Sequence, residues 1–116
     1  MSIERLHCGS RMSQVVIHDD TAYLAGQVAD KAAGGTIAAQ TAEILEKIDL
    51  LLSEAGSDSQ KLLTATIWLS DMRHIEEMNN VWDSWVAPGR APCRACVEVR
   101  LAFTRFDVEI MVTAAR

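Results

Sequence analysis

The sequence predicts an α+β fold in which two helices cover one face of a mostly antiparallel sheet of about six strands. Two segments repeat apolar residues at helical spacing, and several others are short β-type runs or alternate with a period of two. The order is strands, long helix, strand, helix and two strands, without a linker, repeat or low-complexity stretch. We therefore expect a single domain over residues 1–116, built as a two-layer sandwich.

The first third of the chain is expected to form strands. Segments 14–18 and 22–28 are apolar β-type runs on either side of a short polar turn, which indicates a hairpin. An edge strand near Ile3 and Leu6 is expected to precede them. Gly26 interrupts the second run and indicates a bulge or a close approach to the backbone.

Two amphipathic helices are predicted. Thr36 is a suitable N-cap for the first, and Gly56 is a suitable residue to end it. A strand over residues 61–69 follows, and a second helix is expected from about Met72 to Ala87, capped by Ser70 or Asp71. The apolar stripe of the first helix comprises Ile37, Thr41, Ile44, Leu45, Ile48, Leu51, Leu52 and Ala55.

The candidate site lies in two C-terminal strands, residues 91–99 and 107–113. If an antiparallel hairpin closes near Ala102-Phe103, then Arg94, Cys96 and Glu109 share one face of the sheet with Met111. A guanidinium can hold a substrate carboxylate with two hydrogen bonds, and a nearby carboxylate can orient or deprotonate a water. Hydrolysis of an electrophilic carbon beside a carboxylate suits these groups. The alternative is an exposed cross-strand ion pair of little energetic value.

Composition narrows the classes of partner. A net charge of −5 argues against a broad nucleic-acid or anionic-membrane surface, although four late arginines leave room for a small-anion pocket. Neither a membrane-length apolar run nor a signal peptide is evident, so the cytoplasm is the expected compartment. Three cysteines are expected to be free thiols, and the Cys and His spacings do not indicate a metal site.

The sheet face without helices is expected to carry Arg94, Cys96, Glu109 and Met111. Trp68 and the thiols indicate that this face is covered, so we expect an oligomer.

Five segments stand out together: Ser13-Gln14, Ala25-Gly26-Gln27, Met78-Asn79, Pro92 to Val99 and Val108-Glu109-Ile110. They resemble the RidA/YjgF family, also called the L-PSP endoribonuclease family, and within it the YoaB-like branch. The resemblance implies a chorismate-mutase-like fold and a homotrimer. It also implies an enamine/imine deaminase, without a metal or organic cofactor, that converts small 2-imino acids derived from 2-aminoacrylate to 2-keto acids and ammonia.

The resemblance also assigns roles in a cleft between subunits. Arg94 would hold the substrate carboxylate, aided by backbone groups at Cys96 and Gly26, and Glu109 would position the attacking water. Further substrate-binding positions are Asn79, Met12 and Ala25.

Two of these positions depart from the family pattern. Met12 stands where the deaminases usually place a tyrosine, and Ala25 where they usually place a serine. A non-catalytic small-carboxylate-binding protein is therefore the alternative. An RNA-cleaving translation inhibitor ranks third because the chain is acidic.

Overall fold

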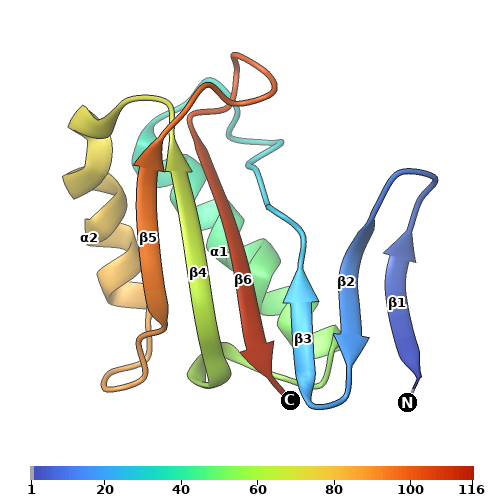
Figure 1. Cartoon of the computed structure of the whole chain (residues 1–116). Helices are drawn as coiled ribbons and strands as arrows, with labels where there is room; N and C mark the ends of the chain where they lie inside the picture. Colours follow the sequence, from blue (N-terminus) through green and yellow to red (C-terminus); the bar gives the residue numbers. More distant parts are fainter. Residues whose placement is uncertain (1) are drawn as a thin grey trace.

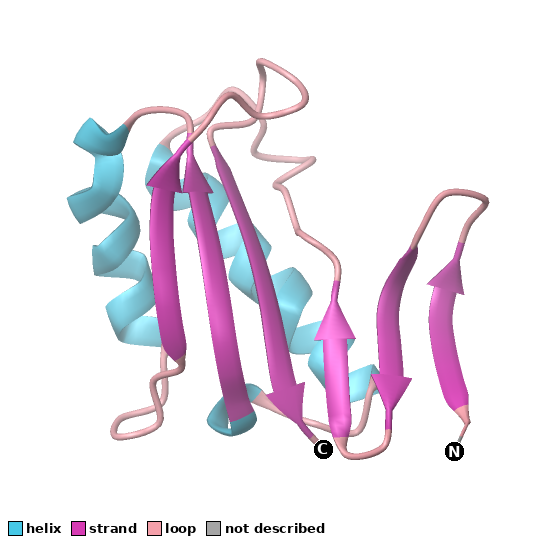
Figure 2. Cartoon of the chain, viewed as in Figure 1, coloured by secondary structure: helices cyan, strands magenta, loops and turns pink. Residues whose placement is uncertain are grey.

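The computed structural model describes residues 2–116 and contains one six-stranded sheet with two helices on one face (Figures 1 and 2). The predicted two-layer α+β arrangement is confirmed. The strand order is β1-β2-β3-β6-β4-β5. The elements are β1 (Ile3–Cys8), β2 (Ser13–His18), β3 (Thr21–Leu24), α1 (Ile37–Glu54), the single turn η1 (Ser59–Lys61), β4 (Leu62–Leu69), the single turn η2 (Met72–His74), α2 (Ile75–Trp85), β5 (Cys93–Glu98) and β6 (Val108–Ala115).

The pairing of the C-terminal strands differs from the prediction. β5 pairs with β4 in parallel, whereas β6 lies between β3 and β4 and is antiparallel to both. Parallel neighbours need a crossover connection, and α2 supplies it between β4 and β5. The hairpin expected near Ala102-Phe103 is therefore wrong, because β4 separates β5 from β6 (Figure 1).

The core lies between the sheet and the helices. Alternate side chains of the central strands, such as Ile67 and Ile110, are fully buried against the apolar stripe of α1. The predicted cap of α1 is confirmed, since the Ala39 amide donates to Thr36 Oγ1 at 3.0 Å. Gly56 follows the helix with a φ of 80°, a left-handed conformation that favours glycine.

α2 is shorter than the predicted helix over residues 72–87. Asp71 caps only the single turn η2, by accepting from the Arg73 amide, and the α-helix begins at Ile75. It ends at Trp85, because Val86 is already extended and Pro88 disfavours helical backbone just before it.

The strand expected over residues 22–28 is interrupted at Gly26. β3 ends at Leu24, and Gln27 then forms an isolated bridge with Ile110 of β6. The irregularity predicted at Gly26 is confirmed, and the group that approaches the backbone there is the side chain of Glu109.

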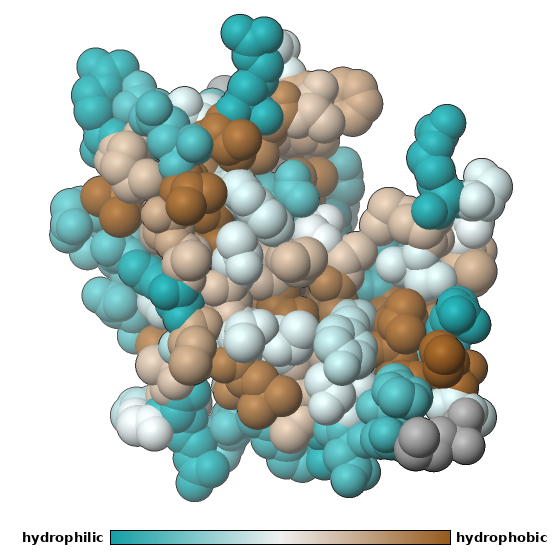
Figure 3. All heavy atoms as spheres, in the orientation of Figure 1, coloured by the Kyte–Doolittle hydropathy of each residue, from teal (hydrophilic) through white to brown (hydrophobic). Residues whose placement is uncertain are grey.

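The sheet face without helices, called here the open face, includes Tyr23, Thr66, Val97, Glu109 and Met111. Tyr23 is 46% exposed, Val97 44% and Met111 38%. Strongly hydrophilic side chains lie mainly around the rim of this face (Figure 3). Large apolar side chains in contact with water indicate a surface that another molecule covers.

Among residues 2–116, no helix combines the length and apolar character needed to cross a bilayer.

Candidate functional site

Arg94 lies on β5, at one edge of the sheet, and its side chain extends to the helix side. Its partner on β4 is the buried Ala65, and its Nη1 donates to Oδ1 of Asn79 on α2 at 2.9 Å. The guanidinium carbon is 5.5 Å from the ring centroid of Trp82, also on α2. Arg94 is nevertheless exposed, so its remaining N–H groups face solvent. The result is an anchored cation that can still bind an anion.

Two neighbours of Arg94 on β5 share its face. Cys96 packs against the core, and burial raises the pKa of its thiol, an effect that the nearby Arg94 charge partly offsets. The carboxylate of Glu98 accepts a hydrogen bond from the Met72 amide at 2.8 Å. At neutral pH Cys96 is therefore a protonated wall residue and is not an activated nucleophile.

Glu109 lies on β6 and belongs to the open face, opposite Trp68 of β4. Its carboxylate lies over Gly26, where a Cβ would come within 2.1 Å of Oε2. The pKa of Glu109 is raised from its ordinary value of 4.5 because burial disfavours the charged form. Only glycine at position 26 leaves room for this carboxylate.

Arg94 and Glu109 therefore lie on opposite faces of the same sheet. The prediction that they share one face is wrong. The alternation within each strand was predicted correctly, but the error lay in aligning the apolar faces of β5 and β6. In β6 the apolar residues face the helices, whereas in β5 Ala95 and Val97 face the open side. The alternative, a cross-strand ion pair, is also absent among residues 2–116.

The other predicted site residues divide between these two surfaces. Asn79 and Cys96 lie with Arg94 on the helix side of β5, whereas Gly26 lies against Glu109 and Ala25 precedes it in the chain. Met12 belongs to neither group: it is half exposed in the turn between β1 and β2. Met111 lies on the open face as expected, but Arg94 and Cys96 do not.

Trp82 is a site residue that the sequence analysis did not single out. It is buried, and its ring supports the guanidinium of Arg94. Asn79 and Trp82 are three residues apart, which places them on the same face of α2. That spacing was the available signal, but it becomes informative only once α2 is known to lie against β5.

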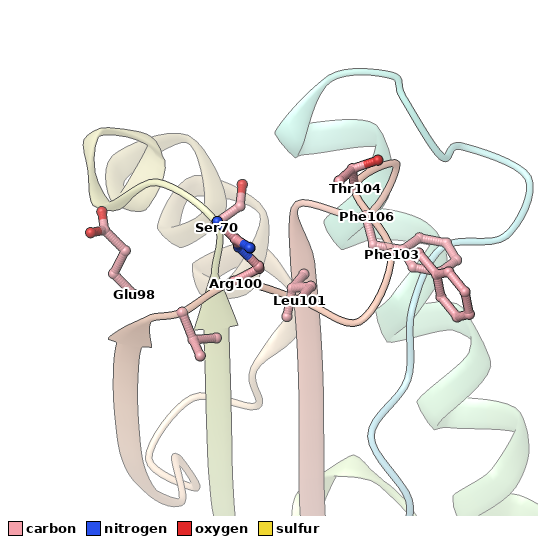
Figure 4. A pocket seen from close by; sticks show the side chains of 8 residues that line it. Ser70, Glu98, Arg100, Leu101, Phe103, Thr104 and Phe106 are labelled. Carbon is pink, nitrogen blue, oxygen red and sulfur yellow. The ribbon is translucent and has the colours of Figure 1, made fainter.

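A hollow of about 340 Å³ lies at the connection between β5 and β6 (Figure 4). Glu98, Arg100 and Phe103 contribute to its walls, and neither Arg94 nor Glu109 reaches it. Arg105 stacks on Phe103 and Phe106, with its guanidinium carbon 4.9 and 4.5 Å from the two ring centroids. Sequence patterns do not predict this hollow because, apart from Glu98 at the end of β5, it is lined by loop residues.

The fold and these surfaces define a known class of protein. The Endoribonuclease L-PSP family model matches residues 2–116, so the chain belongs to that family. The predicted membership of the RidA/YjgF family is confirmed.

Individual relatives resemble the chain over nearly its whole length. A RutC family protein of Haemophilus ducreyi is 42% identical over 113 residues, which cover 97% of this chain and 96% of the relative. The RutC family protein YoaB of Escherichia coli is 39% identical over 115 residues, 99% of each chain. The crystal structure of NMB1025 from Neisseria meningitidis, a member of the YjgF protein family, has 45% identity and a TM-score of 0.96. That match covers 100% of this chain and 96% of NMB1025.

Proposed function

We propose that this protein is an enamine/imine deaminase that hydrolyses small 2-imino acids in a cleft between two copies of the chain. The observation that carries the proposal is the separation of Arg94 from Glu109 on opposite faces of one sheet. A site that uses both groups takes Arg94 from one copy and Glu109 from a neighbour. Membership of the L-PSP family supports the reaction class.

The same separation sets the type of assembly. Arg94 lies at the β5 edge and Glu109 on the open face, so the contact that joins them uses two different surfaces. A contact between unlike surfaces is head-to-tail, and it closes into a ring when the rotation allows. The homotrimer is our proposed ring, with the open-face residues Tyr23, Val97 and Met111 covered by the neighbouring copies.

The proposed reaction needs only side chains and water. Arg94 holds the substrate carboxylate with two hydrogen bonds, which fixes C2 of the imine near Glu109 of the neighbour. Ionised Glu109 takes a proton from water as its oxygen bonds to C2, and the C=N electron pair moves to nitrogen. Protonated Glu109 returns the proton to nitrogen, which gives a neutral carbinolamine. Glu109 then carries the hydroxyl proton to nitrogen, the hydroxyl oxygen forms the C=O bond with C2 as the C–N bond breaks, and ammonia leaves. One imino acid and one water give one 2-keto acid and one ammonia, and the reaction uses no cofactor.

The remaining wall residues set substrate preference in this proposal. Backbone groups at Cys96 and Gly26 complete the polar contacts, while Met12 and Ala25 offer only apolar surface. Small 2-imino acids with short apolar side chains, such as the imine derived from 2-aminoacrylate, are the expected substrates. The cytoplasm is the proposed site of this reaction.

The direct test follows keto-acid release from 2-aminoacrylate generated in situ, with wild type, Arg94→Ala and Asn80→Ala. Asn80 is the exposed neighbour of Asn79 and serves as the matched control. Loss of the carboxylate anchor is expected to lower kcat/KM at least about 100-fold, whereas Asn80→Ala retains activity. The proposal is overturned if wild type releases keto acid no faster than buffer, or if the kcat/KM of Arg94→Ala equals that of wild type.

The second candidate is a carboxylate-binding protein without turnover, favoured by the apolar Met12 and Ala25. It predicts that 2-ketobutyrate raises the melting temperature of wild type but not of Arg94→Ala, with no turnover of 2-aminoacrylate. RNA cleavage, suggested by the family's description, ranks third because a net charge of −5 disfavours binding to phosphates.

A further inference from the structure

A groove of about 280 Å³ lies between the β1–β2 hairpin and α1, on the helix side of the sheet. Arg94 and Glu109 do not contribute to it. Gln14 and Gln27 line one wall, Leu50 and Leu51 another, and the charged residues His7, Lys47 and Glu54 complete the boundary. The volume suits a molecule of several non-hydrogen atoms.

Gln27 presents an unsatisfied acceptor to this groove. The residue is only 4% exposed, and its amide nitrogen donates to Gln14 Oε1 at 2.8 Å and to the Ala25 carbonyl at 3.0 Å. A carbonyl can only accept, so this contact fixes which end of the Gln27 amide is nitrogen. Its Oε1 accepts no hydrogen bond from residues 2–116. Every fully buried polar side-chain atom of these residues has a hydrogen-bond partner, so this oxygen is not fully buried. The oxygen is therefore open to the groove that Gln27 lines.

Gln14 adds a donor beside that acceptor. Its Oε1 receives the hydrogen bond from Gln27, which turns its own amide nitrogen away from that contact. Within the described part of the chain this nitrogen has no acceptor. The wall thus offers a C=O from Gln27 and an N–H from Gln14, the complement of a ligand with an N–H next to a C=O.

The charged groups around the groove are paired with one another. His7 has a φ of 53°, a left-handed conformation within β1, and its ring Nε2 bonds the carboxylate of Glu54 on α1. Lys47 donates to the Val28 carbonyl at 2.7 Å and to Asp30 at 3.0 Å. Because these charges already have partners, the unsatisfied groups in the groove are neutral, which favours a neutral ligand.

We propose that this groove is a second ligand site, which binds small neutral amides that have adjacent N–H and C=O groups and an apolar body. The ligand N–H donates to Gln27 Oε1, the ligand C=O accepts from the Gln14 amide nitrogen, and the apolar body lies on Leu50 and Leu51. The site does not use Arg94 or Glu109 of the proposed deaminase cleft.

The test uses δ-valerolactam as the probe and N-methyl-δ-valerolactam as the control that lacks the donor. Binding is followed by amide chemical shifts of the isotope-labelled full-length protein. We expect saturable shifts centred on Gln14, Gln27 and Leu50, and about tenfold weaker binding of the methylated lactam, which leaves the Gln27 oxygen unpaired.

Two variants locate the site. Leu50 is 62% exposed, so Leu50→Arg fills the groove with little strain and is expected to abolish binding. Ala39→Arg changes an exposed position of α1 that lies roughly 16 Å along the helix, and it is expected to bind like wild type. The proposal is overturned if the chemical shifts do not saturate or if both lactams bind with equal affinity. It is also overturned if a folded Leu50→Arg variant binds as well as wild type.

Discussion

Arg94 is held from two sides although its strand forms the edge of the sheet. Asn79 accepts a hydrogen bond from its Nη1, and Trp82 lies beneath its guanidinium. Both partners lie on α2, so the crossover helix sets the direction in which the cation points. Positioning of this kind reduces the entropy lost when a carboxylate binds.

Replacement of Asn79 tests this positioning role. Asn79→Ala leaves the charge of Arg94 intact but frees its side chain, so we expect KM for the imino acid to rise about fivefold with a smaller change in kcat. Steady-state kinetics beside Asn80→Ala measure the effect. Equal KM values for the two variants would show that Asn79 does not position the arginine.

Gly26→Ala tests the position of Glu109. The new Cβ would lie 2.1 Å from Oε2, so the carboxylate must move, while the flexible side chain limits the cost in stability. We expect kcat to fall at least about tenfold with little change in melting temperature. Gly9→Ala is the control, because its Cβ would lie 3.6 Å from the nearest atom, an ordinary contact. An unchanged kcat in Gly26→Ala would show that the position of the Glu109 carboxylate does not affect catalysis.

The raised pKa of Glu109 predicts the pH dependence of the rate. The proposed base acts in its ionised form, so kcat/KM rises with pH as the carboxyl loses its proton, with a midpoint above the ordinary 4.5. Glu109→Gln cannot titrate and should lack this limb. Rates that do not change as the pH rises from 4.5 would count against Glu109 as the base.

At the scale of elements, one buried polar side chain ties α1 to the start of β6. Gln40 is fully buried, its amide nitrogen donates to the Gly35 carbonyl and to Asp107 Oδ2, and its oxygen accepts from the Asp107 amide. The sequence pattern did not single it out, because a glutamine beside an apolar stripe usually faces solvent.

Gln40→Leu is expected to lower the free energy of unfolding by about 2 kcal/mol, since it removes the hydrogen bonds of a fully buried side chain and leaves the Gly35 carbonyl and the Asp107 amide without this partner. Urea denaturation measures the change, and Gln60→Leu at an exposed position is the control. A loss no larger than that of the control would show that water replaces these hydrogen bonds.

Local pattern predicted the elements well but not their pairing. The cap at Thr36, the stop at Gly56 and the two-residue alternation of β5 and β6 all follow from backbone and side-chain chemistry within a few residues. Pairing is a long-range property: the same alternation in β5 is compatible with either β4 or β6 as neighbour. Because β4 pairs with both β5 and β6, and β5 does not pair with β6, Arg94 and Glu109 lie on opposite faces.

At the scale of the whole molecule, the single chain exposes both halves of the proposed site and completes neither. The open face presents Glu109 among exposed apolar side chains, and the β5 edge presents Arg94. The strand alternation singled out these residues from the sequence, and the resemblance to known proteins assigned their roles. Their distribution between two surfaces became visible only in the fold, and it makes the interface between copies the place where function is expected.

Mixed oligomers test this division most directly. Arg94→Ala and Glu109→Gln chains, each with only residual activity alone, are unfolded together at equal amounts and refolded, and native mass spectrometry confirms that they mix. If each site takes Arg94 from one chain and Glu109 from the next, random assembly restores about a quarter of the wild-type sites and a matching fraction of imine hydrolysis. Mixed oligomers that remain inactive would contradict a site shared between copies.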